Sequence, residues 1–335
     1  MTETQQKVAV VTGGTAGVGR ATVREFARRG YDVAILARGA AGLKGTAEDA
    51  QQAGVRALPL PVDVADAAAV SQAAATIESE LGEISVWVNM AFVGALTYSW
   101  DTSLEEFRRM TDVTYYGQVH GTLTALEHMR PRDRGVIINV GSALAYRGIP
   151  LQSAYCGAKH AVVGFSESVM TELAHEKSNV RVCMVQLPAL NTPQFNWNLS
   201  RVWRHPMPVP PIFQPEVAAK GITFLAEHPR RNMWIGLSTA WTILGERVAP
   251  LFLDRYLGRT GVSAQQTGKN APRLGVNLWQ PRDDKADQGA RGAFSDEAHA
   301  DDPQLWLSKH RRGLLLGTAA TAIAGIAGIT ASRFL

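Results

Sequence analysis

The feature that most constrains the fold is a regular alternation of short apolar runs with stretches of helical character. The apolar runs lie at 7–12, 32–37, 55–62, 84–89, 136–140, 180–187 and 233–237. The helical stretches between them lie at 20–29, 40–53, 66–81, 103–129, 153–177 and 215–228. Strands joined by helices imply right-handed crossovers and parallel pairing. The sequence therefore predicts an α/β fold, a doubly wound parallel sheet of about seven strands with helices on both faces.

The composition changes after residue 187. Prolines and aromatic residues recur through 188–215, which is unsuited to a strand or a long helix. We interpret 188–215 as a lid over an apolar substrate, and a loop packed on the sheet is the alternative. Residues 1–240 should then form the catalytic domain, including this lid. Residues 241–310 should form a C-terminal extension, with an amphipathic helix at 241–259 and a partly irregular or disordered stretch at 261–303.

Residues 313–331 carry no charged side chain. A helix of that length would span about 28 Å, close to the thickness of a bilayer core. Lys309, Arg311 and Arg312 precede it, and cationic residues favour the cytoplasmic side. We therefore expect a transmembrane helix at 313–331 that anchors a cytoplasmic catalytic domain. A packed or flexible terminal helix is the alternative.

A glycine-rich run follows the first apolar run and opens the first helical stretch. It reads T-G-G-T-A-G-V-G over residues 12–19. Glycines permit a tight turn and let backbone N–H groups approach a pyrophosphate at the positive end of a helix. This context predicts a Rossmann-type dinucleotide site with Thr12, Gly13, Thr15, Gly17, Val18 and Gly19 as cofactor-binding residues.

The end of the second apolar run bears on the choice of dinucleotide. Enzymes that use NAD usually place an acid there for the ribose 2′-hydroxyl, whereas this chain has Ala37 and then Arg38. A cation suits a 2′-phosphate, so the sequence favours NADP as the cofactor. One solvated arginine would give the same pattern, so NAD remains the alternative.

Three polar side chains lie between residues 142 and 159. Tyr155 and Lys159 are four residues apart and share one face of a helix, and Ser142 follows the apolar run 136–140. A neighbouring ammonium is expected to lower the pKa of a phenol and so prepare it for proton transfer. A packed tyrosine and an exposed lysine on an ordinary helix are the alternative interpretation.

Taken together, these motifs resemble the short-chain dehydrogenase/reductase family. The glycine run 12–19, Asp63-Val64, V-N-M-A at 88–91, Ser142 and Y-C-G-A-K at 155–159 carry the resemblance, which covers about residues 7–240. It implies an NAD(P)-dependent enzyme that interconverts a carbonyl and an alcohol. Tyr155 would be the general acid and base, Lys159 would hold the nicotinamide ribose, and Ser142 would orient the substrate oxygen. It also implies a homo-oligomer.

The resemblance implies four further cofactor contacts and one catalytic position. Asp63 and Val64 would meet the adenine, Asn89 would lie beside the cofactor, and Thr192 would hold the carboxamide. The chain departs from the family pattern at Met90, Phe92 and Ala189. Thr114 also replaces the asparagine that completes the family's catalytic tetrad, and we expect its hydroxyl to relay protons less efficiently.

The leading functional hypothesis is an NADP-dependent oxidoreductase that acts on a hydrophobic carbonyl or alcohol. The departures at Met90, Phe92 and Thr114 keep open a catalytically weak cofactor-binding regulator or scaffold. An isomerase or dehydratase that uses the nicotinamide transiently is a minor third possibility. The net charge of +4 is modest and gives no nucleic-acid footprint. The histidines lack metal-ligand spacing, so we expect no metal site.

Overall fold

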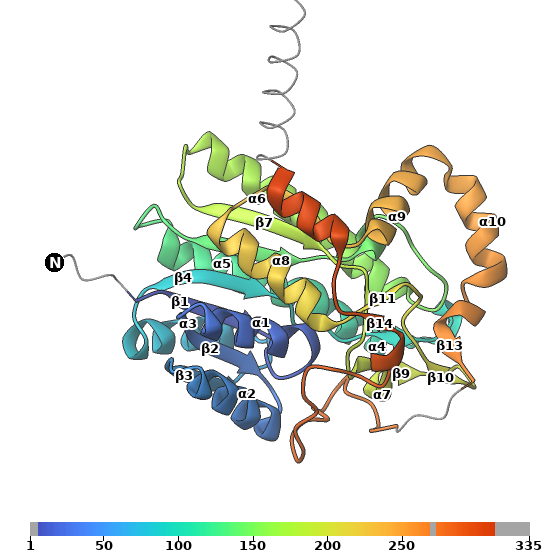
Figure 1. The fold of residues 1–335 in the computed structure, drawn as a ribbon, viewed down its shortest axis with the longest axis horizontal. Helices are drawn as coiled ribbons and strands as arrows, with labels where there is room; N and C mark the ends of the chain where they lie inside the picture. The colour runs from blue at the N-terminus through green and yellow to red at the C-terminus, as the bar shows by residue number, and fades with distance from the viewer. Residues whose placement is uncertain (1–5, 269–272, 312–335) are drawn as a thin grey trace, which may run out of the picture.

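The centre of the molecule is a parallel β-sheet (Figure 1). The structure is a computed structural model that describes residues 6–268 and 273–311. The sheet has seven strands in the order β12-β7-β6-β4-β1-β2-β3, and each neighbouring pair runs parallel. The strands are β1 (Val8–Thr12), β2 (Asp32–Ala37), β3 (Ala57–Pro61), β4 (Ile84–Asn89), β6 (Val136–Val140), β7 (Arg181–Gln186) and β12 (Asn232–Trp234). The prediction of a doubly wound parallel sheet is confirmed.

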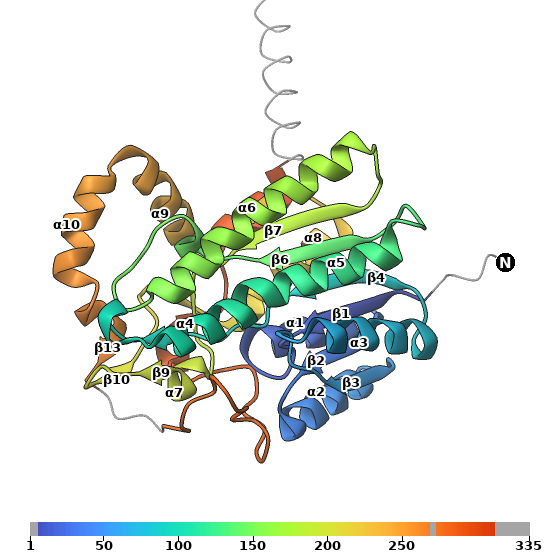
Figure 2. The ribbon, with the colours of Figure 1, turned by 180° about the vertical axis from the view of Figure 1, so that it is seen from behind.

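Helices cover both faces of this sheet (Figures 1 and 2). One face packs against α1 (Gly17–Arg28), α2 (Ala40–Gln52) and α8 (Pro215–Glu227). The other face packs against α3 (Ala67–Glu80), α5 (Gly117–Met129) and α6 (Ser153–His175). The helix α4 (Leu104–Thr111) continues into α5 through a π-helical turn, Asp112–Tyr116. The helical stretch expected at 103–129 is therefore one long rod with a wide turn in its middle.

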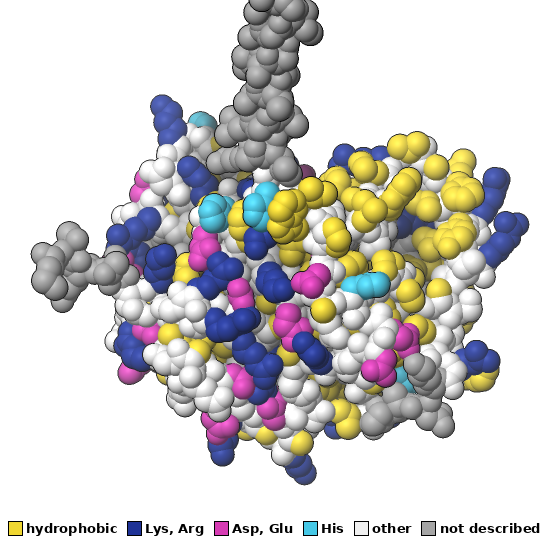
Figure 3. Space-filling model, viewed as in Figure 1, with side chains coloured by type: hydrophobic (Ala, Val, Ile, Leu, Met, Phe, Trp, Pro, Cys, Tyr) yellow, Lys and Arg dark blue, Asp and Glu magenta, His cyan; other side chains and the backbone are white. Residues whose placement is uncertain are grey.

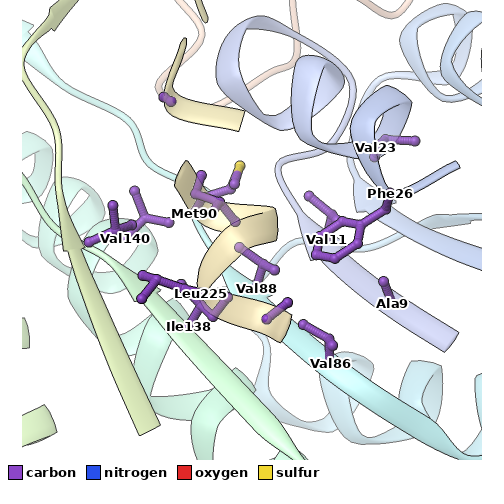
Figure 4. Close-up of a cluster of buried hydrophobic side chains, with 14 of the residues drawn as sticks. Ala9, Val11, Val23, Phe26, Val86, Val88, Met90, Ile138, Val140 and Leu225 are labelled. Carbon is purple, nitrogen blue, oxygen red and sulfur yellow. The ribbon is translucent and has the colours of Figure 1, made fainter. Parts of the chain in front are cut away.

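The alternation of side chains along each strand divides the interior into two apolar layers. On β1, Ala9 and Val11 point to the α1 and α8 side, where Phe26 and Leu225 also lie (Figure 4). Val8 and Val10 point to the opposite layer. All residues of β1 and β2 are buried, as expected of strands covered on both faces.

A polar network crosses the layer between the sheet and α5. Asn89 Oδ1 accepts a hydrogen bond from Trp87 Nε1 at 2.8 Å, and its Nδ2 donates to Thr122 Oγ1 at 3.0 Å and Asn139 Oδ1 at 2.9 Å. Asn139 Nδ2 in turn donates to Ser166 Oγ at 2.9 Å on α6. These buried polar groups are mutually satisfied, so they tie β4 and β6 to two helices.

The segment after β7 is built from short elements. They are β8 (Ala189–Leu190), α7 (Gln194–Trp197), β9 (Leu199–Ser200), β10 (His205–Pro206) and β11 (Ile212–Phe213). β9 pairs with β5 (Ala95–Leu96), and β10 pairs with β13 (Gln266–Thr267). Residues 241–259, expected to be helical, form two helices, α9 (Leu237–Val248) and α10 (Pro250–Thr260). Pro250 lacks the N–H that a continuous helix would need at this point.

The C-terminal extension returns across the molecule to the first helices. Residues 276–289, here named the strap, lie beside the N-terminal ends of α1 and α2 in both ribbon views. After the strap, β14 (Ala298–His299) pairs with β11, and residues 303–311 are helical. As expected for 261–303, the strap contains no helix or strand. It is not disordered, because backbone hydrogen bonds join it to α1 and α2.

Exposed apolar side chains gather over α9 and α10 (Figure 3). They include Trp241, Val248, Leu251 and Phe252, each more than 60% exposed. The expected transmembrane helix at 313–331 lies outside the described residues. Within 6–268 and 273–311, no helix is long and apolar enough to cross a membrane.

At Gly121, α5 lies so close to the sheet that there is no room for a side chain. A Cβ at this position would lie 2.0 Å from Asn89 Oδ1 and 2.7 Å from Trp87 Nε1. We expect Gly121→Ala to lower the free energy of unfolding by about 1–3 kcal/mol through overpacking. Gly164→Ala in α6 is the matched control, since an added Cβ there meets nothing within 4 Å. Urea titration should show the control unchanged or up to about 1 kcal/mol more stable. Equal midpoints for the two variants would contradict this account.

Candidate active site

A cavity of about 550 Å³ lies along the carboxyl ends of the central strands. In parallel sheets this edge, beside the point where strand order reverses, is where ligands bind. Most of the residues singled out from the sequence line this cavity. They are Gly13, Thr15, Gly17, Val18, Gly19, Arg38, Asp63, Val64, Ser142, Tyr155, Lys159 and Thr192. Thr12, Asn89 and Thr114 do not line it.

The glycine run forms a close turn whose geometry excludes side chains. Gly13 has a φ of +70°, and its N–H donates to Leu36 O at 2.7 Å, which ties the turn to β2. A Cβ on Gly19 would lie 2.0 Å from Gly13 O. Thr12 Oγ1 accepts hydrogen bonds from Met90 N at 3.0 Å and Ala91 N at 3.2 Å. Thr12 therefore supports the turn from beneath, while the glycines leave open backbone at the start of α1.

The serine, tyrosine and lysine converge on one wall of the cavity. Tyr155 and Lys159 come from adjacent turns of α6, and Ser142 follows β6 and hydrogen-bonds the Tyr155 hydroxyl. Lys159 is 2% exposed, and its Nζ donates to Val140 O at 2.6 Å. Its Nζ lies 5.8 Å from the centroid of the Tyr155 ring. The side chain of Phe92 packs edge-on against the same ring at 5.7 Å.

Burial is the main influence on the pKa values of Tyr155 and Lys159. It raises the pKa of Tyr155 to about 12, against a smaller lowering by the Ser142 hydrogen bond. Burial also lowers the pKa of Lys159 to about 7. The expected lowering of the Tyr155 pKa by a lysine ammonium is therefore wrong for this structure. The amine is itself desolvated, and it is bonded to a carbonyl oxygen rather than to the phenol.

Thr114 lies in the π-helical turn and is fully buried. Its Oγ1 donates to Val93 O at 3.0 Å and accepts from Val93 N at 3.2 Å. Because the hydroxyl proton is committed to a carbonyl oxygen, Thr114 fastens the loop after β4, which carries Phe92. Thr114 therefore supports the loop beside Tyr155, and its expected part in a proton relay stays a prediction.

Asn89 is also placed away from the cavity. Its amide is fully engaged in the buried network with Trp87, Thr122 and Asn139, and Met90 and Ala91 line the cavity in its place. The side-chain amide of Asn89 therefore serves the interior, and the expectation that Asn89 lies beside the cofactor stays a prediction.

Arg38 and Asp63 lie at the ends of β2 and β3. Arg38 Nη2 donates to Asn277 O at 2.6 Å, and its Nη1 donates to Trp279 O at 3.0 Å. Asp63 accepts a hydrogen bond from Arg109, and Arg38 lies 3.9 Å away. Burial alone would raise the pKa of Asp63, but the two guanidinium groups bring it below its usual value. Burial lowers the pKa of Arg38.

The match to a known family covers the region that builds this cavity. Residues 7–201 match the family model described as short chain dehydrogenase. The chain belongs to the short-chain dehydrogenase family. It is 33% identical over 255 residues to the uncharacterized oxidoreductase YxnA of Bacillus subtilis (strain 168), which covers 76% of this chain and 72% of that protein. It is 35% identical over 176 residues to a 3-oxoacyl-[acyl-carrier-protein] reductase of Bos taurus, covering 52% of this chain and 73% of that protein.

Solved structures of short-chain dehydrogenases share the fold. One from Mycobacterium marinum is 26% identical with a TM-score of 0.60, over 68% of this chain and 93% of that chain. An alcohol dehydrogenase from Thermococcus sibiricus, complexed with 5-hydroxy-NADP, is 24% identical with a TM-score of 0.60, over 69% of this chain and 95% of that chain. Both alignments cover nearly the whole of the other chain, and roughly a third of the present chain has no counterpart in them.

Several cavity residues of this short-chain dehydrogenase were not foreseen from the sequence. Asn198 is 5% exposed, and its Oδ1 has no hydrogen-bond partner among the described residues. A Cβ on Gly94 would lie 3.8 Å from Asn198 Nδ2 and 3.9 Å from Tyr155 Cδ2, so both side chains approach Gly94. Residues of α9, α10 and the strap also line the cavity. No local motif marks these positions, because long-range packing alone brings them there.

The cavity has groups suited to a nicotinamide dinucleotide. Gly13, Gly17 and Gly19 leave backbone where a Cβ would collide with neighbouring atoms. Thr192 Oγ1 is buried against the cavity and has no hydrogen-bond partner in the part of the chain that the structure describes. It is therefore available to a polar group such as a carboxamide. Across the described residues, no cluster of three His, Cys, Asp or Glu side chains is placed to hold a metal ion.

The buried amine of Lys159 should make the free energy of unfolding depend on pH. With a pKa of about 7 when folded and 10.5 in the exposed reference, Lys159 is protonated in the unfolded chain but not in the folded chain between these values. Unfolding then takes up a proton, so stability should rise with pH in this window, by up to ~1.4 kcal/mol per unit. We expect Lys159→Met to lose this slope in denaturant titrations from pH 7 to 10. Parallel curves for the wild type and the variant would refute the lowered pKa.

Thr114 offers a matched pair of substitutions. Thr114→Val keeps the shape but leaves Val93 N and O unpaired, which should cost about 1–3 kcal/mol of stability. It should also lower kcat, because the loop holds Phe92 against Tyr155. Thr114→Ser retains the hydroxyl and should stay closer to wild type in both measurements. If valine were tolerated as well as serine, the two bonds to Val93 would have no supporting role.

Proposed function

We propose that this chain is an oxidoreductase that interconverts a carbonyl and an alcohol on an apolar substrate, with Tyr155 as general acid and base. The observation that carries the proposal is the convergence of Ser142, Tyr155 and Lys159 on the same cavity as the glycine turn. The residues in place fit a nicotinamide dinucleotide, which when bound supplies or accepts the hydride. The reductase name of the bovine relative agrees with this reaction class.

The protein groups have separable roles in this reaction. The glycine turn and the start of α1 would bind the pyrophosphate, Thr192 would bind the carboxamide, and Asp63 and Val64 would border the adenine. Ser142 would hold the substrate oxygen beside the Tyr155 hydroxyl. Lys159 would bind the nicotinamide ribose, and its Val140 bond holds the side chain near the tyrosine.

The protonation of Tyr155 favours the reductive direction at neutral pH. A phenol with a pKa of about 12 remains protonated, so it can donate a proton to an oxygen that becomes negative as hydride arrives at the carbonyl carbon. Oxidation needs the phenolate, which burial disfavours. The proton balance is simple: Tyr155 loses its proton to the alcohol formed and regains one from solvent.

The substrate portion of the cavity is mainly apolar. Segment 188–215 contributes Phe195, Trp197 and Met207, while Leu253 and Leu257 come from α10. This wall supports the interpretation of 188–215 as a cover over an apolar substrate. Asn198 is a polar group in this wall and can bind a second polar atom of the substrate.

Tyr155→Phe tests the proposal. Removing the hydroxyl should lower kcat by about 10²–10⁴-fold, because the proton donor is lost, while dinucleotide binding stays unchanged. The change in kcat is measured by steady-state oxidation of NADH and NADPH with a panel of apolar ketones and aldehydes. Dinucleotide binding is measured by calorimetric titration. Dinucleotide binding with no turnover of any carbonyl by wild type would favour the regulator or scaffold. Substrate conversion without net cofactor oxidation would favour an isomerase or dehydratase.

A further inference from the structure

The strap, residues 276–289, closes over the part of the cavity at the ends of β2 and β3. Asn277, Pro281, Arg282 and Asp283 of the strap line the cavity together with Arg38. β2 and β3 lie on the far side of β1 from β6, which leads to the catalytic serine. If the nicotinamide reacts beside Tyr155, the strap therefore covers the adenosine part of the dinucleotide.

The strap engages the cation that a 2′-phosphate would need. Arg38 donates to the backbone oxygens of Asn277 and Trp279 at 2.6 and 3.0 Å, and a third carbonyl, that of Leu278, lies at 3.5 Å. The guanidinium therefore acts as a clamp that fixes the strap. Its Nη1 and Nη2 donate to neutral carbonyl oxygens, although the side chain also lines the cavity.

The strap also caps the helix end that could receive a phosphate. At the N-terminus of α2, Ala40 N donates to Asp284 Oδ1 at 3.2 Å and Ala41 N donates to Asp284 O at 3.1 Å. Gly42 N donates to Asp283 O at 2.9 Å. The free N–H groups of the first helical turn are the usual receptors for an anion. Here the chain's own oxygen atoms bind them.

The side chain of Asp283 brings a negative charge to the same place. It is 7% exposed and lines the cavity, and its carboxylate makes no hydrogen bond within residues 6–268 and 273–311. The carboxylate packs against two glycines: a Cβ would lie 1.9 Å from Oδ1 at Gly39 and 2.3 Å from Oδ2 at Gly42. The charge of Arg38 acts on this carboxylate, whose oxygens remain available to accept hydrogen bonds from a ligand that brings hydroxyl groups.

We propose that Asp283 selects NAD(H) over NADP(H) by accepting a hydrogen bond from the adenosine ribose. The inference rests on the proposed function, since it requires dinucleotide binding. A carboxylate accepts hydrogen bonds from ribose hydroxyls but repels a 2′-phosphate, and the acid at the end of the second strand plays this part in other dinucleotide sites. Here the acid comes from the far end of the chain and compensates for Ala37, while Arg38 holds the strap.

Arg282 could have the opposite effect to Asp283, since a cation would attract the 2′-phosphate of NADP, and the experiment must distinguish the two residues. It is exposed, it lines the cavity, and its Nε donates to Val276 O at 2.8 Å. If this cation governed binding of the 2′-phosphate, NADP would be preferred and Arg282→Ala would abolish that preference. The proposal instead makes Asp283 the residue that sets the ratio of affinities.

Equilibrium titration of the full chain with NAD⁺, NADP⁺, 5′-AMP and 2′,5′-ADP tests the proposal without turnover. We expect NAD⁺ and 5′-AMP to bind at least ~10-fold more tightly than their 2′-phosphorylated counterparts. Asp283→Ala should weaken NAD⁺ by about 10-fold and strengthen NADP⁺. Asp283→Asn, which keeps an acceptor without the charge, should mainly strengthen NADP⁺. Asp284→Asn is the control: it removes one exposed negative charge of the same strap but keeps the oxygen that accepts from Ala40 N, so the ratio should stay unchanged.

The outcomes separate the two proposals. Tighter NADP⁺ binding by wild type, or an unchanged ratio in both Asp283 variants, would overturn the role of Asp283 while leaving the proposed function standing. A wild-type chain that binds neither dinucleotide would overturn the proposed function itself. Thermal unfolding of each variant shows whether it is folded, and the asparagine variant carries the test if the alanine variant is not.

Discussion

The bond between Lys159 and the Val140 carbonyl is the interaction on which the site depends. An amine that is 2% exposed must be satisfied within the protein, and here the last residue of β6 satisfies it at 2.6 Å. Because α6 carries both Lys159 and Tyr155, the bond fixes the tyrosine relative to the sheet. Ser142 is fixed from the neighbouring strand, where its N–H donates to Gln186 Oε1 at the end of β7 at 2.9 Å. The three reactive side chains are thus anchored to the carboxyl ends of two adjacent strands.

The surrounding loops extend this arrangement. Thr12 and Thr114 each use one hydroxyl to bind backbone of the segment after β4, Thr12 at Met90 and Ala91 and Thr114 at Val93. Phe92 lies between these contacts and packs on Tyr155. The departures from the family pattern at Met90, Phe92 and Thr114 therefore preserve a packed wall beside the tyrosine. They need not signal a lost activity.

The sheet and the reactive trio follow from local sequence, whereas several partners do not. The bounds expected for β2, β4 and β6 agree with the structure, because strands buried on both faces are continuous apolar runs. Tyr155 and Lys159 were found because four-residue spacing on a helix is a local property. The interior network of Asn89 could not be foreseen, because an amide at a strand end can serve either a ligand or the interior. The helical character expected at 241–259 is also found, and Pro250 marks the point where α9 gives way to α10.

The strap gives Arg38 partners that its local sequence does not reveal. Arg38 follows β2 as in a site for a 2′-phosphate, but its partners are backbone carbonyls at 277–279, which carry no side-chain signal in a sequence. The strap is polar, so its composition suggested disorder. It is held instead by an ion pair between Arg20 and Asp287, by the capping of α2, and by Leu278, which is 1% exposed in the core. The charge at the ends of β2 and β3 is therefore set by Arg38 together with the strap, two segments about 240 residues apart in the chain, so neither segment alone describes it.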